Sequence, residues 1–212
     1  MIMKLQEHTN RKGGKYKKKI ILITMSMIML FSSMVFAITF SDVSGHWAET
    51  FIIDLANKGV INGYTDGTYR PNNTLTYGEY FKLIVTASIP DADFSLMENK
   101  VDHWAGAYLT VLENYKIFEP GEITKEILDT KISRIEVVRV LGQCDINIRE
   151  TPQKTVGLEF NDIQDINDLQ SNMLRHAVAV GVINGDPTGT FRPYGELKRS
   201  EVAKIIATYT AE

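Results

Sequence analysis

Cysteine is nearly absent from this 212-residue chain, in which Cys144 is the only one. No intrachain disulfide can form, so the fold must be held together by core packing alone. We expect Cys144 to be a small buried apolar residue rather than a reactive thiol. Combinations of residues that carry catalysis are also missing: the sequence shows no Ser/His/Asp order, no His-x-x-Glu-His motif and no Cys–His arrangement. We therefore expect no enzyme activity, no metal and no cofactor.

Acidic residues are scarce in the first 37 residues, where Glu7 is the only acid beside seven Lys and Arg. This segment carries a formal charge of +6, which leaves −9 for residues 38–212 because the whole chain is at −3. An apolar stretch of 17 residues, from Ile20 to Phe36, follows the cations, and Val35-Phe36-Ala37 suits a signal peptidase. Residues 1–37 therefore predict a signal peptide that is cleaved after Ala37. The alternative is an uncleaved membrane anchor, for which the stretch is marginal because a spanning helix needs about 20 apolar residues.

Two distant parts of the sequence repeat each other without a gap. At an offset of 122, Gly59-Val60-Ile61-Asn62-Gly63 recurs as Gly181-Val182-Ile183-Asn184-Gly185, Arg70-Pro71 as Arg192-Pro193, and Glu79 as Glu201. A more divergent copy lies between them at an offset of 57, where His46-Trp47 recurs as His103-Trp104, Thr76 as Ser133 and Glu79 as Glu136. This middle copy lacks the glycine-rich turn, and Pro120-Gly121 stands where Gly63-Tyr64 is expected. A fixed period is typical of proteins built from repeated supersecondary units.

Each copy predicts a helix, a loop and a second helix, because apolar residues recur with a helical period on both sides of the turn. The stripes of the first helices are Trp47, Phe51, Ile52, Leu55 and Ala56; Trp104, Tyr108, Leu109 and Leu112; and Leu169, Met173, Leu174, Ala177 and Val178. The second helices carry Tyr80 and Ile84, Val137 and Leu141, and Val202 and Ile206 at matching positions. One helix pair buries its apolar face poorly by itself, so we expect a mostly α domain in which three helix-loop-helix repeats pack with pseudo-threefold symmetry. The predicted boundaries are residues 38–90, 91–145 (the degenerate copy) and 146–212.

The order of motifs in the first copy resembles the S-layer homology (SLH) repeat. These motifs are Phe40-Ser41-Asp42-Val43, His46-Trp47-Ala48, the Gly-Val-Ile-Asn-Gly turn, Asp66-Gly67-Thr68-Tyr69-Arg70-Pro71 and Thr76-x-x-Glu79. The third copy has the same order from Phe160-Asn161-Asp162-Ile163, with two extra residues before its helix and no Trp. The resemblance spans residues 40–210 and implies three SLH repeats packed as a pseudo-threefold SLH trimer.

The resemblance also implies a ligand. SLH proteins bind secondary cell-wall polysaccharides, commonly through a terminal pyruvylated amino sugar, in grooves between neighbouring repeats. A Thr-Arg-Ala-Glu motif at the start of the second helix supplies the Arg that meets the ligand carboxylate. Here the motif stands as Thr76-Tyr77-Gly78-Glu79, Ser133-Arg134-Ile135-Glu136 and Lys198-Arg199-Ser200-Glu201. The first copy has lost the Arg, so one of the three grooves lacks its cation.

The same motif has a structural interpretation, because Ser/Thr-x-x-Glu is a helix capping box. Capping explains the Glu of the motif, but it does not explain Arg134 and Arg199. A cation near a helix N-terminus is mildly unfavourable unless an anion docks beside it. We therefore predict that Arg134, Arg199 and Ser133 bind the ligand, with a plain solvated arginine as the alternative.

Two aromatic and two glycine residues complete the predicted ligand-binding set. Trp47 and Trp104 are expected to pack on the core stripe, and their ring edges could also form a groove wall against a sugar face. Gly63 and Gly185 are expected at positive φ, and their lack of a side chain would let a sugar approach the backbone.

Other polar residues of the loops have simpler explanations. Arg70 and Arg192 are expected to brace their loops. Calcium at Asp66 and Asp186 is disfavoured, because their spacing does not match an EF-hand loop.

Together these features predict a non-enzymatic protein that is exported and held without covalent bonds to an anionic, pyruvylated cell-wall polysaccharide. A surface protein without disulfides fits the cell wall of a Gram-positive-type bacterium. The alternative is a structural or adaptor component of a surface layer, which self-associates or partners a larger surface protein. Nucleic acid is not an expected partner, and a membrane is one only if the signal segment is retained.

Overall fold

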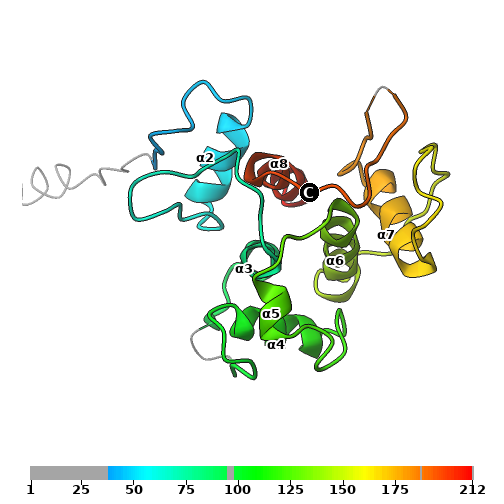
Figure 1. Cartoon of the computed structure of the whole chain (residues 1–212), viewed down its shortest axis with the longest axis horizontal. Coiled ribbons are helices and arrows are strands. Elements are labelled where there is room, and N and C mark those ends of the chain that lie inside the picture. The colour runs from blue at the N-terminus through cyan, green and yellow to red at the C-terminus, as the bar shows by residue number, and fades with distance from the viewer. Residues whose placement is uncertain (1–37, 95–97, 187, 212) are drawn as a thin grey trace, which may run out of the picture. The chain divides into compact units, whose positions relative to one another are not determined.

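The computed structural model describes residues 38–94, 98–186 and 188–211. Residues 1–37, with the predicted signal peptide or membrane anchor, lie outside the described residues. Ile38–Glu212 forms one unit of helices joined by long loops (Figure 1). Within the described ranges, no helix combines the length and the apolar character needed to cross a bilayer.

Seven helices make up the regular structure in this part of the chain. They are α2 (Glu49–Asn57), α3 (Tyr77–Ser88), α4 (Gly106–Asn114), α5 (Lys125–Leu128), α6 (Arg134–Asn147), α7 (Asp168–Ala179) and α8 (Arg199–Tyr209). Isolated antiparallel bridges pair Thr74 with Lys198, Thr76 with Lys131 and Ser133 with Glu196. Each bridge joins two different copies of the predicted repeat, so together they close a ring near the N-terminal ends of α3, α6 and α8. The prediction of a mostly α fold is confirmed.

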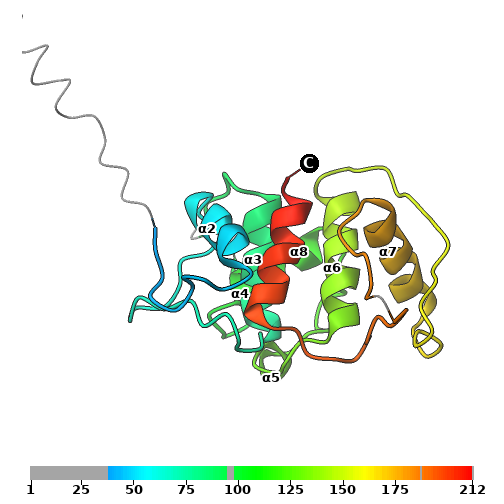
Figure 2. The same cartoon turned by 90° about the horizontal axis from the view of Figure 1, so that it is seen from above.

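The second helices of the three copies, α3, α6 and α8, run side by side through the centre of this unit (Figures 1 and 2). Each is covered by the first helix of the following copy: α4 packs on α3, α7 on α6 and α2 on α8. The short α5 also packs on α3. The partner of every first helix therefore belongs to a different copy, which interlocks the copies rather than leaving them as separate beads.

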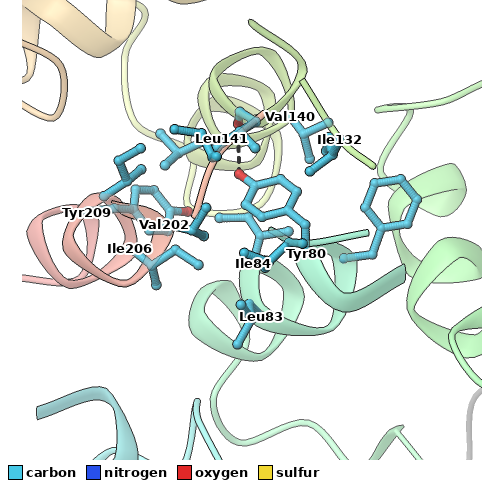
Figure 3. Packing of buried hydrophobic residues seen from close by; sticks show 14 of the residues in the cluster. Tyr80, Leu83, Ile84, Ile132, Val140, Leu141, Val202, Ile206 and Tyr209 are labelled. Carbon is cyan, nitrogen blue, oxygen red and sulfur yellow. Dashed lines mark hydrogen bonds between the residues drawn. The ribbon is translucent and has the colours of Figure 1, made fainter. Parts of the chain in front are cut away.

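Apolar residues at matching positions of the second helices meet at the centre of this bundle (Figure 3). Tyr80, Ile84, Leu141 and Ile206 have 0% exposure. The Tyr80 hydroxyl donates a hydrogen bond of 2.7 Å to the carbonyl oxygen of Val137, so burial does not leave this polar group without a partner. Full burial of one such side chain contributes about 1.5–3 kcal/mol, and this shared contact ties the three copies together.

Cys144 lies in the same core, on α6, and is fully buried as predicted. Burial raises the pKa of its thiol, because desolvation disfavours the thiolate. The protonated, inaccessible sulfur acts as a small packing group, not as a nucleophile.

The apolar stripes of the first helices are mostly as predicted. The buried members are Ile52, Leu55 and Ala56 on α2, Leu109 and Leu112 on α4, and Met173, Leu174 and Ala177 on α7. The stripes differ at their N-terminal ends, where Trp47, Trp104 and Leu169 are exposed. The apolar face that meets the neighbouring second helix therefore begins later than the periodicity suggests.

An aspartate near the start of the first copy holds its Arg-Pro loop. The Asp42 carboxylate accepts hydrogen bonds from the backbone N–H groups of Tyr69, at 2.8 Å, and Arg70, at 2.7 Å. Arg70 has a φ of 60°, in the left-handed region that is unfavourable for a residue with a side chain. The third copy repeats this arrangement with Asp162, Phe191 and Arg192. The two charge-assisted bonds hold the loop in this strained conformation.

Candidate functional site

Two grooves are lined by equivalent residues. The first, the Trp104 groove, is lined by Val60, Ile61, Asn62, Gly63, Tyr64, Glu79, Lys82, Leu83, Trp104 and Arg199. The second, the Trp47 groove, is lined by Trp47, Arg134, Val182, Ile183, Asn184, Gly185, Glu201, Lys204 and Ile205. Their volumes are about 180 and 210 Å³, smaller than the pockets that hold drug-sized ligands. Each groove is of a size to hold one small group or the end of a chain.

Each groove is assembled from all three copies. In the Trp104 groove, the turn at residues 60–64 and the start of α3 come from the first copy, Trp104 from the second and Arg199 from the third. The Trp47 groove has the same construction with the order rotated, so its turn belongs to the third copy and Arg134 to the second. The packing of α4 on α3 and of α2 on α8 brings each Trp to its groove. Neither site exists until the copies have interlocked.

The expectation that Trp47 and Trp104 pack in the core is wrong. The two residues are 57% and 54% exposed. The cause is local, because each Trp is followed by an N-cap alanine, Ala48 or Ala105, that turns inward with 0% exposure. Each indole instead forms part of a groove wall, where it can meet a sugar face.

A histidine supports the turn that carries each indole. The Nδ1 atoms of His46 and His103 accept hydrogen bonds of 3.1 Å from the backbone N–H groups two residues later. Their imidazole rings lie 5.6 and 5.4 Å from the indole rings that follow, between centroids. These histidines therefore position the tryptophans.

Gly63 and Gly185 have φ values of 65° and 70°, as predicted. A Cβ atom at these positions would overlap the ring of Phe40 and that of Phe160, respectively. Glycine is therefore required by both the backbone conformation and the close approach of an aromatic ring. Both glycines line their grooves, which is where the predicted ligand contact would be made.

Arg199 is the first residue of α8 and is held in place at the Trp104 groove. Its Nε donates to the carbonyl oxygen of Tyr69 at 2.9 Å, and its Nη1 donates to the Glu79 carboxylate at 3.0 Å. Its Cζ also lies 5.0 Å from the centroid of the Tyr64 ring. Glu79 has a second task, since it accepts the backbone N–H of Thr76 at 2.9 Å and so caps α3. The guanidinium of Arg199 is thus largely engaged by the protein.

Arg134 occupies the equivalent place on α6 but has fewer partners. Its Nη1 lies 3.7 Å from the Glu201 carboxylate, and its Cζ is 5.4 Å from the centroid of the Phe191 ring. Its Nε is buried without a hydrogen-bond partner. Burial lowers the pKa of this guanidinium, because desolvation disfavours the cation. A cation that is partly shielded from water and poorly hydrogen-bonded is suited to receive an anion.

The third equivalent position contains Tyr77 in place of an arginine. Tyr77 is half-buried and packs edge-on against Phe81, with ring centroids 5.9 Å apart. This aromatic packing replaces the guanidinium of the two grooves, so the position offers no cation at the start of α3.

The remaining polar groups of this third position bond to one another. Glu136, the counterpart of Glu79, forms an ion pair of 2.9 Å with Arg139 and accepts a 2.9 Å hydrogen bond from Gln170. The Arg139 guanidinium also lies over the Phe118 ring, with Cζ 4.5 Å from its centroid. These internal contacts therefore occupy the residues whose counterparts line the two grooves.

Ser133 is not among the residues that line either groove, and its side chain makes no capping hydrogen bond to α6. The capping box predicted for Ser133 and Glu136 is therefore wrong, because Glu136 is bound to Arg139 and Gln170 instead. The capping box at Thr76 is confirmed. The role predicted for Ser133 in binding remains a prediction.

Asp66 and Asp186 stabilise tight turns. The Asp66 carboxylate accepts hydrogen bonds from the hydroxyl (2.6 Å) and backbone N–H (3.0 Å) of Thr68, and it pairs with Arg70 at 2.9 Å. These interactions, led by the Thr68 hydroxyl, lower the pKa of Asp66 to about 2. Arg70 therefore braces its loop as predicted, whereas Arg192 lies 3.8 Å from Glu201. Among the described residues, no three potential metal ligands gather in one place.

Sequence reasoning missed several residues of the groove linings, including two pairs of polar residues. Lys82 and Lys204 lie one helical turn after the glutamates, and Asn62 and Asn184 lie in the glycine-rich turns. Both pairs are identical in the two intact copies and replaced in the middle copy, by Arg139 and Glu119. That pattern of identity was the available signal.

Comparisons with known proteins agree with the repeated motifs. The family model of the S-layer homology domain matches residues 39–81 and 177–203. The chain is 28% identical over 172 residues to an amylopullulanase of Thermoanaerobacterium thermosulfurigenes, a match that covers 79% of this chain and 9% of that protein. It is 27% identical over 204 residues to an S-layer protein of Bacillus licheniformis, with 92% and 23% coverage, respectively. It is 33% identical over 96 residues to a cellulosome-anchoring protein of Acetivibrio thermocellus, with 42% and 22% coverage.

The chain spans less than a quarter of the length of each of these relatives. The two matched segments contain the Gly-Val-Ile-Asn-Gly turns, the Arg-Pro loops and the starts of α3 and α8. They include part of the lining of both grooves, while Trp104 and Arg134 lie outside them. With a mostly helical fold and relatives among S-layer proteins, the chain is an S-layer homology domain protein.

Proposed function

We propose that this protein anchors itself to the cell wall by binding an anionic wall polysaccharide in the Trp47 and Trp104 grooves. The observation that carries the proposal is the repeated combination of an exposed indole with an arginine at a helix N-terminus. An indole stacks on the apolar face of a sugar, while an arginine forms paired hydrogen bonds with a carboxylate. The positive end of the helix dipole favours the same negative charge. A pyruvylated amino sugar offers both features in one residue.

The charge of the molecule makes local cations necessary. Residues 38–212 carry a formal charge of −9, so the domain as a whole repels an anionic polymer. Lys82 and Lys204 add a second cation beside Arg199 and Arg134, respectively. Moderate salt screens the long-range repulsion more than it screens contacts inside a groove. Binding should therefore persist when the salt concentration is raised to about 0.15 M, where the Debye length is about 8 Å. A simple surface attraction would be lost under the same conditions.

The relatives support a location at the cell surface and a function without catalysis. Two of them are named as an S-layer protein and a cellulosome-anchoring protein. The match to the amylopullulanase covers a small part of that enzyme. We therefore assign to this chain the anchoring part of such proteins, on an exported protein of a Gram-positive-type cell wall.

Co-sedimentation tests this function. Residues 38–212 are mixed with purified wall sacculi, before and after chemical removal of the secondary polysaccharide. We expect the protein to pellet with intact sacculi and to stay in solution with stripped ones. Equal pelleting with both preparations would show that the polysaccharide is not the ligand.

A further inference from the structure

The two grooves share their construction but differ in how the protein uses the arginine. In the Trp104 groove, Arg199 donates hydrogen bonds to Tyr69 and Glu79. In the Trp47 groove, the Nε of Arg134 is buried with no partner, and the distance from Nη1 to Glu201 is 3.7 Å. The first arginine is already bound to an internal carboxylate, while the second is without such a bond.

The residue at the end of the glycine-rich turn contributes to this difference. In the Trp104 groove it is Tyr64, whose hydroxyl donates to Glu79 at 3.2 Å and whose ring lies beside the Arg199 guanidinium. In the Trp47 groove the equivalent residue is Asp186, which has no ring to stack. The Asp186 carboxylate accepts hydrogen bonds from the backbone and hydroxyl groups of Thr188 and Thr190, and its charge acts on Arg134 without a hydrogen bond.

A second pair of equivalent arginines, Arg70 and Arg192, also differs in its contacts. Arg70 forms a 2.9 Å ion pair with Asp66 beside the Trp104 groove. Its counterpart, Arg192, is 66% exposed and lies 3.8 Å from Glu201. Glu201 therefore stands between two cations, Arg134 and Arg192, and neither distance is that of a short hydrogen bond.

We infer that the Trp47 groove is the primary anion site and that the Trp104 groove is a weaker, secondary site because Glu79 already neutralises Arg199. This inference rests on the proposed function and concerns the ranking of the two grooves. A carboxylate that enters the Trp104 groove meets the Glu79 charge 3.0 Å from Arg199 and must share the guanidinium with it. A carboxylate that enters the Trp47 groove gives the half-buried guanidinium of Arg134 hydrogen bonds that the protein does not supply.

The chain offers a separate reporter for each groove, because Trp47 and Trp104 are its only tryptophans. In the full chain, Trp104→Phe leaves Trp47 as the fluorophore, and Trp47→Phe leaves Trp104. Each variant is titrated with the methyl glycoside of an amino sugar that carries a pyruvate ketal, and the groove with the retained Trp is the one measured. We expect half-saturation at the Trp47 groove at a concentration at least about tenfold lower than at the Trp104 groove, the usual effect of one charge-assisted hydrogen bond.

A second substitution tests the cause. Glu79→Gln keeps an oxygen that can cap α3 but removes the charge that pairs with Arg199, so it should tighten binding at the Trp104 groove severalfold. Glu201→Gln is the matched control, and it should change binding at the Trp47 groove by less than about threefold because its carboxylate is only loosely paired. A purely structural role for Glu79 predicts weaker binding instead.

The outcomes separate this inference from the proposed function. Equal half-saturation in the two grooves, or tighter binding at the Trp104 groove, would overturn the ranking. No gain from Glu79→Gln would overturn the cause given for it, and each of these results leaves both grooves as binding sites. If neither fluorophore responds and calorimetry detects no heat with the glycoside or with purified wall polysaccharide, the proposed function fails and the ranking fails with it.

Discussion

Replacing Asp42 with alanine is expected to destabilise the folded domain by about 2 kcal/mol. The carboxylate accepts two backbone hydrogen bonds, of 2.8 and 2.7 Å, and both belong to the loop that leads to α3. Because Asp42 is exposed, each bond is taken at the low end for a charged group, about 1.5 kcal/mol, which gives about 3 kcal/mol in all. Arg70 can then leave its left-handed conformation, which returns about 1 kcal/mol.

The assay is urea denaturation of residues 38–212, followed by circular dichroism, with a thermal melt as a second measurement. For a domain of this size, a loss of about 2 kcal/mol lowers the melting temperature by roughly 4–8 °C. Asp162→Ala is the matched variant in the third copy and should cost a similar amount, because its hydrogen bonds are also 2.8 and 2.7 Å. Asp42→Asn keeps one acceptor oxygen, so its stability should fall between those of the unaltered protein and Asp42→Ala. A change below about 0.5 kcal/mol for both alanine variants would refute the reasoning, since it would mean that these carboxylates do not hold the loops.

Three further predictions follow from the same contacts. Deleting residues 160–212 removes α7 and α8, which cover α6 and α2, so the remaining copies should lose cooperative unfolding. A thermal melt as sharp and at as high a temperature as that of the intact domain would show that the copies fold independently. The pKa of Asp66 measured by NMR should lie near 2, because Thr68 and Arg70 favour its ionised form. The turn has this stabilisation above about pH 4, the pKa in the unfolded chain, and loses it as the pH falls toward 2. A measured pKa near 4 would contradict these hydrogen bonds. Tyr77→Ala should lower stability through loss of its packing on Phe81 and leave glycan affinity unchanged, and calorimetry that finds weaker binding would mean that the third position takes part.

Much of the fold was predictable because each copy of the repeat predicts the same pair of helices. Offsets of 122 and 57 located three helix pairs, and the matching apolar positions of the second helices identified the residues at the centre of the bundle. The exchange of partners, in which α4 covers α3 and α2 covers α8, was not predictable. A stripe shows that a helix needs an apolar partner, but it does not show which of three equivalent partners it takes.

The candidate site was predictable in part for the same reason. The arginines stood out because capping does not require a cation there, and the structure places Arg134 and Arg199 in two equivalent grooves. The tryptophans were misassigned to the core because helical periodicity extends past the true helix start, and a shift of one residue moves the side chain from the interior to the groove wall. The failed capping box at Ser133 arose from Arg139 and Gln170, which are distant in sequence from one another and compete for the same glutamate.

The central claim is that Arg134 and Arg199 bind the anionic group of a wall polysaccharide. Calorimetric titration of the Arg134→Ala, Arg199→Ala double variant with purified wall polysaccharide tests it most directly, with thermal melts to confirm that the variant remains folded. Each arginine contributes a charge-assisted contact of roughly 1.5–3 kcal/mol, so each single alanine variant should weaken binding at its own groove about tenfold or more, and the double variant should bind too weakly to detect. Lysine at the same positions should restore binding only in part, because the planar fork of the guanidinium is lost. A folded double variant that binds the polysaccharide as tightly as the unaltered protein would contradict the account.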